Sequence, residues 1–150
     1  MNIIFIILLL GAVFCAFMMG RWDFQRRIIP DVYLFPFLLI GLTIVQFFPW
    51  VVSPSDAIIG GLVGYFLPLT MGALWGLRKK NKSDAIGLGD IKLLGAGGIW
   101  LGLTGLAIAI VISSVAAAFW GWRKKQKFIP FAPFFFGGVI CALIVMKFLI

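Results

Sequence analysis

Residues 2–20, NIIFIILLLGAVFCAFMMG, contain no charged side chain and are followed at once by Arg21. A run of this length and polarity is typical of a helix that crosses the roughly 30 Å hydrocarbon layer of a bilayer. Similar runs recur along the chain, which is 63% hydrophobic and only 12% charged. A soluble domain carries about twice that charged fraction. The sequence therefore predicts an integral membrane protein without a separate soluble domain.

Six predominantly apolar spans can be delimited along the chain. The fourth is short and rich in glycine, so its boundary with the fifth is the hardest to place. None of the spans alternates with a period of two, which favours helices over the strands of a barrel. We therefore predict an all-α membrane protein, with a single domain over residues 1–150 that forms a polytopic bundle of about six transmembrane helices. The spans are residues 2–20, 32–52, 56–77, 91–103, 104–122 and 128–150.

The basic residues predict the orientation of the spans. All but one of the 13 Lys and Arg residues follow the first, third or fifth span, and the loop around residues 53–56 has none. Because cytoplasmic loops are enriched in Lys and Arg, we expect these three regions inside and both termini outside. The net charge of +8 is then a topology signal and not evidence for a nucleic-acid partner. In the outer loop, Asp56 is expected to cap the third helix.

The side chains available for chemistry are few. The chain has no histidine and no glutamate, and its two cysteines, Cys15 and Cys141, stand singly inside apolar spans. The sequence therefore predicts neither a metal-ligand set nor a nucleophile paired with histidine, and it implies no cofactor. Any acid–base chemistry depends on the five aspartates.

Two of these aspartates are predicted at the same membrane depth. Asp23 stands at the inner end of the first span, and Asp90 stands at the inner start of the fourth. In a small bundle they can face each other, and two carboxylates that share a proton can activate water and protonate a leaving amine. The residues alone also allow a simpler interpretation, in which Asp23 pairs with Arg26 and Arg27 and Asp90 interacts with a helix dipole.

Three blocks of the sequence resemble the type IV prepilin peptidases, which are membrane aspartic proteases of the GxGD kind. DFQRRIIPD at residues 23–31 looks like that family's aspartate, basic pair and Ile-Pro-Asn segment. DAIGLGDIKL at residues 84–93 is similar to its acidic residue, GxGD motif and following Lys-Leu. IPFAPF at residues 129–134 looks like its late Pro-Phe-Gly-Pro-Phe element. The three blocks occur in the family's order and cover essentially the whole chain.

The resemblance implies an aspartic endopeptidase that removes the basic leader from type IV prepilins or type II secretion pseudopilins. It implies Asp23 and Asp90 as the catalytic pair, at the cytoplasmic side of the bacterial inner membrane. The implied partners are the prepilin or pseudopilin substrate and membrane lipid, with no nucleic acid, cofactor or metal. Other positions in the three blocks are candidate substrate-binding or site-shaping residues: Gly87, Gly89, Lys92, Asp84, Pro30 and Pro133.

Two positions depart from the family's pattern. Asp31 stands where Asn is usual, which keeps a good helix cap but places a further negative charge near the site. Ala132 stands where the late block usually has Gly, which removes some backbone freedom next to Pro133. Neither departure falls on Asp23 or Asp90.

Many members of the family also carry an N-terminal cytoplasmic region with paired CxxC motifs and methylate the new N-terminus. The 150 residues contain neither, so we expect a short form without methyltransferase activity. Two alternatives remain open, namely another GxGD-type protease resembling the preflagellin peptidases, and a non-enzymatic membrane scaffold or transporter. The late block favours the prepilin peptidases, and a transporter should place charge near the bilayer midplane.

Overall fold

The computed structural model describes residues 3–78, 87–125 and 129–149, and within these ranges it contains helices and no strand. This confirms the predicted all-α class. Four helices are long and apolar enough to cross a membrane, and one apolar helix is shorter. The helices are α1 (Ile3–Arg26), α2 (Asp31–Phe47), α3 (Pro54–Arg78), α4 (Leu88–Lys124) and α5 (Phe131–Leu149).

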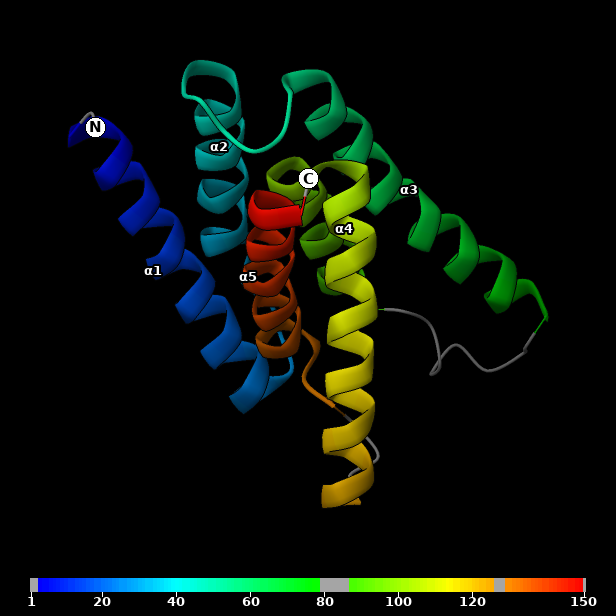
Figure 1. The fold of residues 1–150 in the computed structure, drawn as a ribbon. Coiled ribbons are helices and arrows are strands. Elements are labelled where there is room, and N and C mark those ends of the chain that lie inside the picture. Colours follow the sequence, from blue (N-terminus) through cyan, green and yellow to red (C-terminus); the bar gives the residue numbers. More distant parts are fainter. Residues whose placement is uncertain (1–2, 79–86, 126–128, 150) are drawn as a thin grey trace.

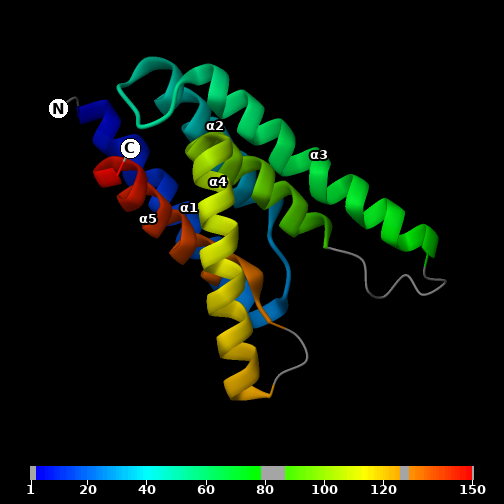
Figure 2. The same ribbon diagram turned by 45° about the vertical axis from the view of Figure 1, so that its right-hand side comes forward.

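The predicted fourth and fifth spans both fall within α4, so six separate helices are not seen in the described residues. Helix α4 is nevertheless interrupted at Gly102, which has φ 65° and ψ −173°. A positive φ is readily adopted only by glycine, and here it breaks the helix into two limbs. Figures 1 and 2 show the first limb rising to this break and the second limb descending from it. The predicted boundary after residue 103 thus lies next to a real reversal of the chain.

Asp56 contributes to this break, which corrects its expected role as the cap of the third helix. Helix α3 begins at Pro54, and the hydroxyl of Ser53 accepts a hydrogen bond from the Asp56 N–H at 3.3 Å. Ser53 therefore caps α3. The Asp56 carboxylate accepts a hydrogen bond of 3.5 Å from the Leu103 N–H, where the second limb of α4 begins. It satisfies a backbone donor that the interruption leaves without a helical partner.

Helices α3 and α4 approach each other closely because glycines line their contact. A Cβ atom on Gly60 would lie 2.5 Å from the Gly98 carbonyl oxygen, and one on Gly64 would lie 2.5 Å from that of Leu94. Small residues allow the backbones of membrane helices to meet in this way. The glycine-rich sequence of the first limb of α4 is therefore explained by helix packing.

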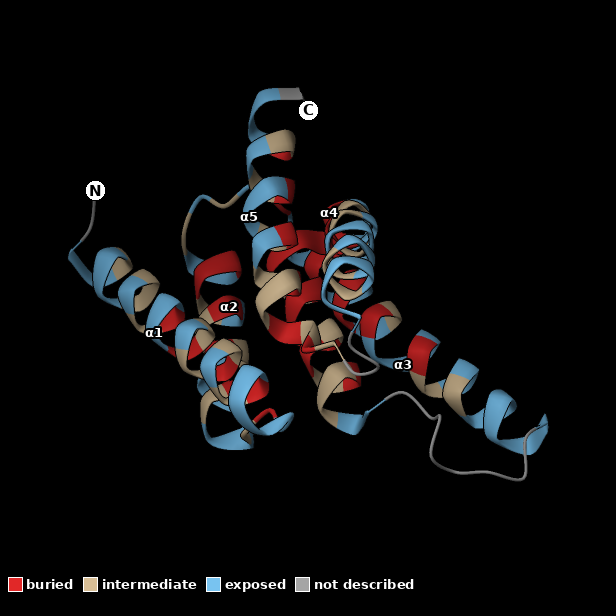
Figure 3. Cartoon of the chain, turned by 90° about the horizontal axis from the view of Figure 1, so that it is seen from below, coloured by how far each residue is buried: buried red, intermediate tan, exposed pale blue. Residues whose placement is uncertain are grey.

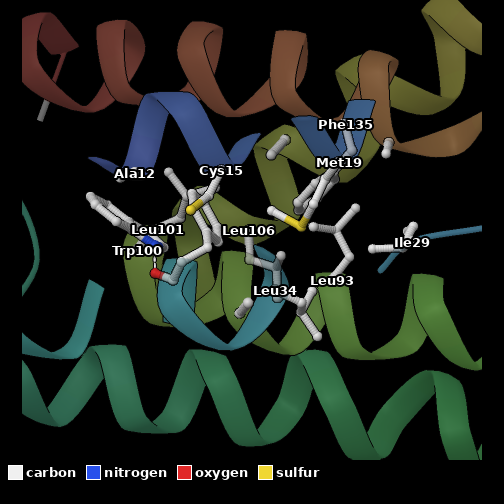
Figure 4. Close-up of a cluster of buried hydrophobic side chains, with 14 of the residues drawn as sticks. Ala12, Cys15, Met19, Ile29, Leu34, Leu93, Trp100, Leu101, Leu106 and Phe135 are labelled. Atoms are coloured by element: carbon white, nitrogen blue, oxygen red, sulfur yellow. Dashed lines mark hydrogen bonds between the residues drawn. The ribbon is translucent and has the colours of Figure 1, made fainter. Parts of the chain in front are cut away.

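The hydrophobic core surrounds the first limb of α4. Leu93 and Leu101 of α4 are fully buried and pack with Leu34 of α2 and Phe135 of α5 (Figure 4). The Trp100 indole N–H donates to the Phe37 carbonyl oxygen at 3.2 Å, which ties α4 to α2. Figure 3 shows buried residues concentrated at this centre, whereas most of α1 and the far end of α3 are exposed. The first limb of α4 is thus the element around which the other helices are placed.

Candidate active site

Asp23 lies in the last two turns of α1, which continues as a helix beyond the predicted span end at residue 20. Its side chain is buried, with 5% of its surface exposed, and its Oδ2 atom accepts a hydrogen bond of 2.8 Å from the Ala132 N–H. Ala132 belongs to the first turn of α5, where backbone N–H groups have no helical acceptor and the helix dipole is positive. The Asp23 carboxylate therefore satisfies and stabilises the start of α5, and α5 in turn fixes its orientation.

The chain turns at Arg27, directly after α1. This residue has a positive φ of 57°, and its N–H donates to the Asp23 carbonyl oxygen at 3.0 Å. Such a left-handed residue is a common way to end a helix, although it usually is glycine. The turn brings Arg27 to the cavity that Asp23 also lines, and the Arg27 charge acts on the Asp23 carboxylate.

Asp90 lies in the first turn of α4, which begins at Leu88. Gly87 precedes the helix with φ −61° and ψ 136°, angles that any residue adopts, so backbone freedom is not the reason for glycine there. Gly89 is constrained by space instead, since a Cβ atom on it would lie 3.3 Å from the Cβ atom of Ile29. Glycine at position 89 thus lets the start of α4 approach the segment between α1 and α2.

The two aspartates line one cavity of about 350 Å³. The two carboxyl groups are close enough for the charge of Asp23 to act on Asp90. The walls come from the end of α1, the segment that follows it, the start of α4 and the residues that lead into α5. The lining residues are Asp23, Arg27, Ile28, Ile29, Gly87, Leu88, Gly89, Asp90, Ile129 and Phe131.

This cavity brings together all three blocks that the sequence analysis singled out. Two carboxylates and one guanidinium group supply its charged groups, and most of its other lining side chains are apolar. A pair of carboxylates in such surroundings can share a proton, and together they can remove a proton from water and deliver one to a leaving group. Among the described residues, no group of three or more His, Cys, Asp or Glu side chains is gathered anywhere.

The other predicted site residues take different places. Lys92 does not line the cavity and instead forms an ion pair with Asp31, with Nζ to Oδ2 at 2.8 Å. Pro30 precedes α2, and its carbonyl oxygen accepts hydrogen bonds from the N–H groups of Tyr33 and Leu34 at 3.2 Å. The further negative charge of Asp31 is thereby matched by the Lys92 ammonium group, across the gap between α2 and α4.

Two predicted residues remain. Pro133 lies next to the Ala132 amide but lines a separate cavity between α1 and α5. Asp84 lies outside the described residues. The structure therefore brings four of the predicted residues into the cavity, namely Asp23, Asp90, Gly87 and Gly89.

Sequence reasoning did not identify several groups that shape the site. The Ala132 N–H is a backbone donor, and the identity of the residue does not reveal that its backbone makes this contact. The sequence indicates Arg27 as a topology signal, as part of the basic pair and as a possible ion-pair partner of Asp23, but not as the left-handed residue that ends α1. Ile29 and Phe131 lie inside the blocks that resemble the family, so the resemblance of those blocks was the sequence signal that could have identified them as lining residues.

Comparisons with known proteins identify the relatives of this sequence. Residues 3–122 match the model of the type IV leader peptidase family. A protein named prepilin leader peptidase/N-methyltransferase from Aeromonas hydrophila is 33% identical over 119 residues, which cover 75% of this chain and 40% of that protein. Its namesake from Burkholderia pseudomallei is 35% identical over 127 residues, covering 80% of this chain and 40% of the relative.

The chain thus spans about 40% of the length of the curated relatives that it matches. No solved structure matches it significantly. The family match includes two of the three blocks, with both cavity-lining aspartates, and extends over most of the chain. From the shared sequence and the multi-pass helical architecture, the chain belongs to the type IV leader peptidase family.

Proposed function

We propose that residues 1–150 form a membrane aspartic endopeptidase that cleaves the leader from type IV prepilins or type II secretion pseudopilins. The observation that carries the proposal is the shared cavity of Asp23 and Asp90, which stand on separate helices yet face the same space. The names of the relatives support leader cleavage as the reaction. Methyl transfer, which those names also include, is not proposed for these residues.

In the proposed mechanism, the two aspartates act as one unit on a water molecule and the scissile peptide bond. One carboxylate removes a proton from the water as it attacks the carbonyl carbon, and the other donates a proton to the amine that leaves. The hydrogen bond from Ala132 holds Asp23 in position, so the pair does not have to be assembled anew for each substrate. Arg27, at the edge of the same cavity, offsets part of the negative charge.

We place this reaction at the cytoplasmic face of the inner membrane. Helices α1, α3 and α4 carry basic residues in their last turns. Figure 1 shows those three helix ends toward the same lower side of the molecule, and the end of α1 belongs to the aspartate cavity. This arrangement supports the orientation expected from the Lys and Arg distribution.

The dyad is tested by cleavage of a co-expressed prepilin in membranes. Asp23→Asn and Asp90→Asn each remove one ionisable group with little change of shape. Each should lower the cleavage rate by roughly 100-fold or more, because positioned acid–base groups contribute factors of that order.

The matched control is Asp56→Asn, which changes the same residue type at the break of α4. It retains an oxygen that can accept the Leu103 N–H and should cleave at nearly the unmodified rate. Substantial cleavage by either dyad variant, with normal amounts of protein in the membrane, would rule out the two-aspartate mechanism.

A further inference from the structure

A second cavity, of about 550 Å³, lies between α1 and α5. These two helices form its walls, and Phe37 of α2 and Trp100 of α4 contribute to its floor. Figure 1 shows α1 leaning away from α5 toward its N-terminal end, whereas the two helices converge at the end of α1 that carries Asp23. The cavity is therefore a groove that runs along the membrane-spanning part of α1, and we refer to it as the α1–α5 groove.

The α1–α5 groove is apolar along nearly its whole length and open at the side. Val13, Phe17 and Ile140 line it and still have 60%, 66% and 61% of their surface exposed. The strongly polar side chains that line it are Arg21 and Gln25, both in the last turns of α1. The groove thus fits an occupant that is apolar through the bilayer and polar at its inner end.

One wall of the groove is suited to a helical occupant. Ala12, Ala16 and Gly20 recur at intervals of four residues, so they lie on one face of α1 and line the groove; Ala12 is already buried in the core, whereas Ala16 and Gly20 are half-buried. Small residues at this spacing allow another membrane helix to come close to the backbone. On the opposite wall, α5 presents larger apolar side chains such as Phe136 and Leu143.

The inner end of the groove is adjacent to the aspartate cavity across the junction between α1 and α5, although the two share no lining residue among those that the structure describes. A Cβ atom on Gly20 would lie 3.9 Å from the Cα atom of Pro133, and both residues line the groove. The next contact along the junction is the hydrogen bond from Ala132 to Asp23, whose carboxylate lines the aspartate cavity. A chain that leaves the groove at Arg21 or Gln25 is therefore within about one helical turn of Asp23 along α1.

We propose that the α1–α5 groove binds the apolar membrane-spanning segment of the prepilin substrate and presents the inner end of that segment to Asp23 and Asp90. This inference rests on the proposed function. The position of the groove beside the aspartate cavity favours a substrate as the occupant, because the proposed dyad acts on a substrate and not on a lipid or a second copy of the chain.

A third cavity, of about 430 Å³, offers a matched control. It is also largely apolar, but it lies between α2, α3 and α4, and Lys92, which is paired with Asp31, lines it. Leu62 of α3 lines this control cavity and is 53% exposed, similar to Val13 and Phe17 in the groove. Changes at Leu62 therefore test whether any exposed apolar cavity gives the same result.

The experiment is site-specific disulfide cross-linking in membranes. Cys15→Ala and Cys141→Ala first remove the native thiols, and this enzyme must still cleave prepilin. Phe17→Cys or Leu62→Cys is then added together with Asp90→Asn, which retains the substrate, and each is oxidised with a prepilin that carries one cysteine in its apolar segment. We expect several-fold more enzyme–prepilin adduct from Phe17→Cys than from Leu62→Cys.

A second measurement uses an active enzyme. Val13→Trp fills the groove from an exposed position and should raise KM for prepilin several-fold with little change in kcat, whereas Leu62→Trp should change neither. Equal adducts from both cysteines, an adduct between two enzyme molecules instead, or an unchanged KM for Val13→Trp would overturn the docking proposal. Failure of the unmodified enzyme to cleave prepilin would instead overturn the proposed function.

Discussion

Ala132 acts in the site through its backbone and not through its methyl group. Its side chain is fully buried, and its N–H donates to the Asp23 carboxylate. This contact gives a physical role to the late block, residues 129–134. Its backbone binds the carboxylate of Asp23, which lies more than a hundred residues earlier in the chain. Alanine preserves this donor where the family usually has glycine, as any residue other than proline would, and its buried methyl group is small.

The backbone contact can be tested by removing the donor. Ala132→Pro eliminates the N–H and should lower prepilin cleavage by at least ten-fold, because a buried carboxylate that loses its hydrogen bond is left roughly 1–3 kcal/mol less favourable. Ala132→Gly keeps the N–H and should cleave at nearly the unmodified rate. Kinetics on purified enzyme in detergent would measure both, and full activity of Ala132→Pro would show that the contact is dispensable.

The ion pair between Lys92 and Asp31 leads to a smaller expected effect. The two side chains are 36% and 50% exposed, and pairs of this kind contribute only about 0–1 kcal/mol. Lys92→Met should therefore lower cleavage only several-fold, through a less firmly positioned start of α4. Asp31→Asn should cost less, since its amide oxygen can still accept a hydrogen bond from Lys92.

The double variant of this pair provides the control. If the two residues act through each other, Lys92→Met combined with Asp31→Asn should be no worse than Lys92→Met alone. Prepilin cleavage rates for the four proteins give the coupling directly. Independent, additive losses would mean that Lys92 acts on something other than Asp31.

At the scale of the helices, the break in α4 is centred on Gly102. Gly102 combines a positive φ with a crowded position, in which a Cβ atom would overlap the Asp56 carboxylate. Gly102→Ala should destabilise the protein by about 1–3 kcal/mol, because it adds backbone strain and displaces Asp56 from the Leu103 N–H. The loss would appear as a lower thermal unfolding temperature in detergent.

Gly72 is the matched control for this change. It lies inside α3, where a Cβ atom would meet no described atom within 4 Å. Gly72→Ala should leave the unfolding temperature unchanged or raise it, because alanine is favoured over glycine in a helix by up to about 1 kcal/mol. A Gly102→Ala protein as stable as Gly72→Ala would contradict the structural role of the break.

The helices could be predicted from the sequence because each apolar run contains at most one charged residue and ends near turn residues or basic residues. The boundary in α4 was harder, since residues 91–122 remain apolar on both sides of Gly102. The reversal is defined by the positive φ of Gly102 and by the carboxylate of Asp56. Neither feature changes the pattern of apolar residues along the sequence. The true end of α1 was also missed, because a span ends where polarity begins, whereas the helix continues to Arg26.

For the whole molecule, the distribution of Lys and Arg makes a prediction that is independent of the site. Reporter fusions after Arg78 and after Lys125 should be active in the cytoplasm, and a fusion after Ser53 should be active outside, because basic loops are retained inside. Alkaline phosphatase and green fluorescent protein report the two sides in complementary ways. An external signal after Arg78 would place the aspartate cavity on the side opposite to the one proposed.

The proximity of Asp23 and Asp90 could be predicted at this scale because one follows an apolar run and the other precedes one, which puts both at the same predicted side of the membrane. The groove between α1 and α5 could not. Its two walls are the first and last helices of the chain, and nothing in either helix specifies how far apart they stand. Their separation follows from the packing of both helices around α2 and the first limb of α4.

The reversal at Gly102 also bears on the lipid that surrounds the protein. At about 1.5 Å per residue, the limb from Leu88 to Leu101 rises roughly 20 Å, and α2 rises about 25 Å. Both are shorter than a hydrocarbon layer of roughly 30 Å, and local thinning is one way in which a bilayer accommodates short elements. In the proposed orientation we expect the outer leaflet to thin toward the turn that Asp56 stabilises. A prepilin segment bound there would have fewer apolar residues to withdraw before its cleavage point reaches water.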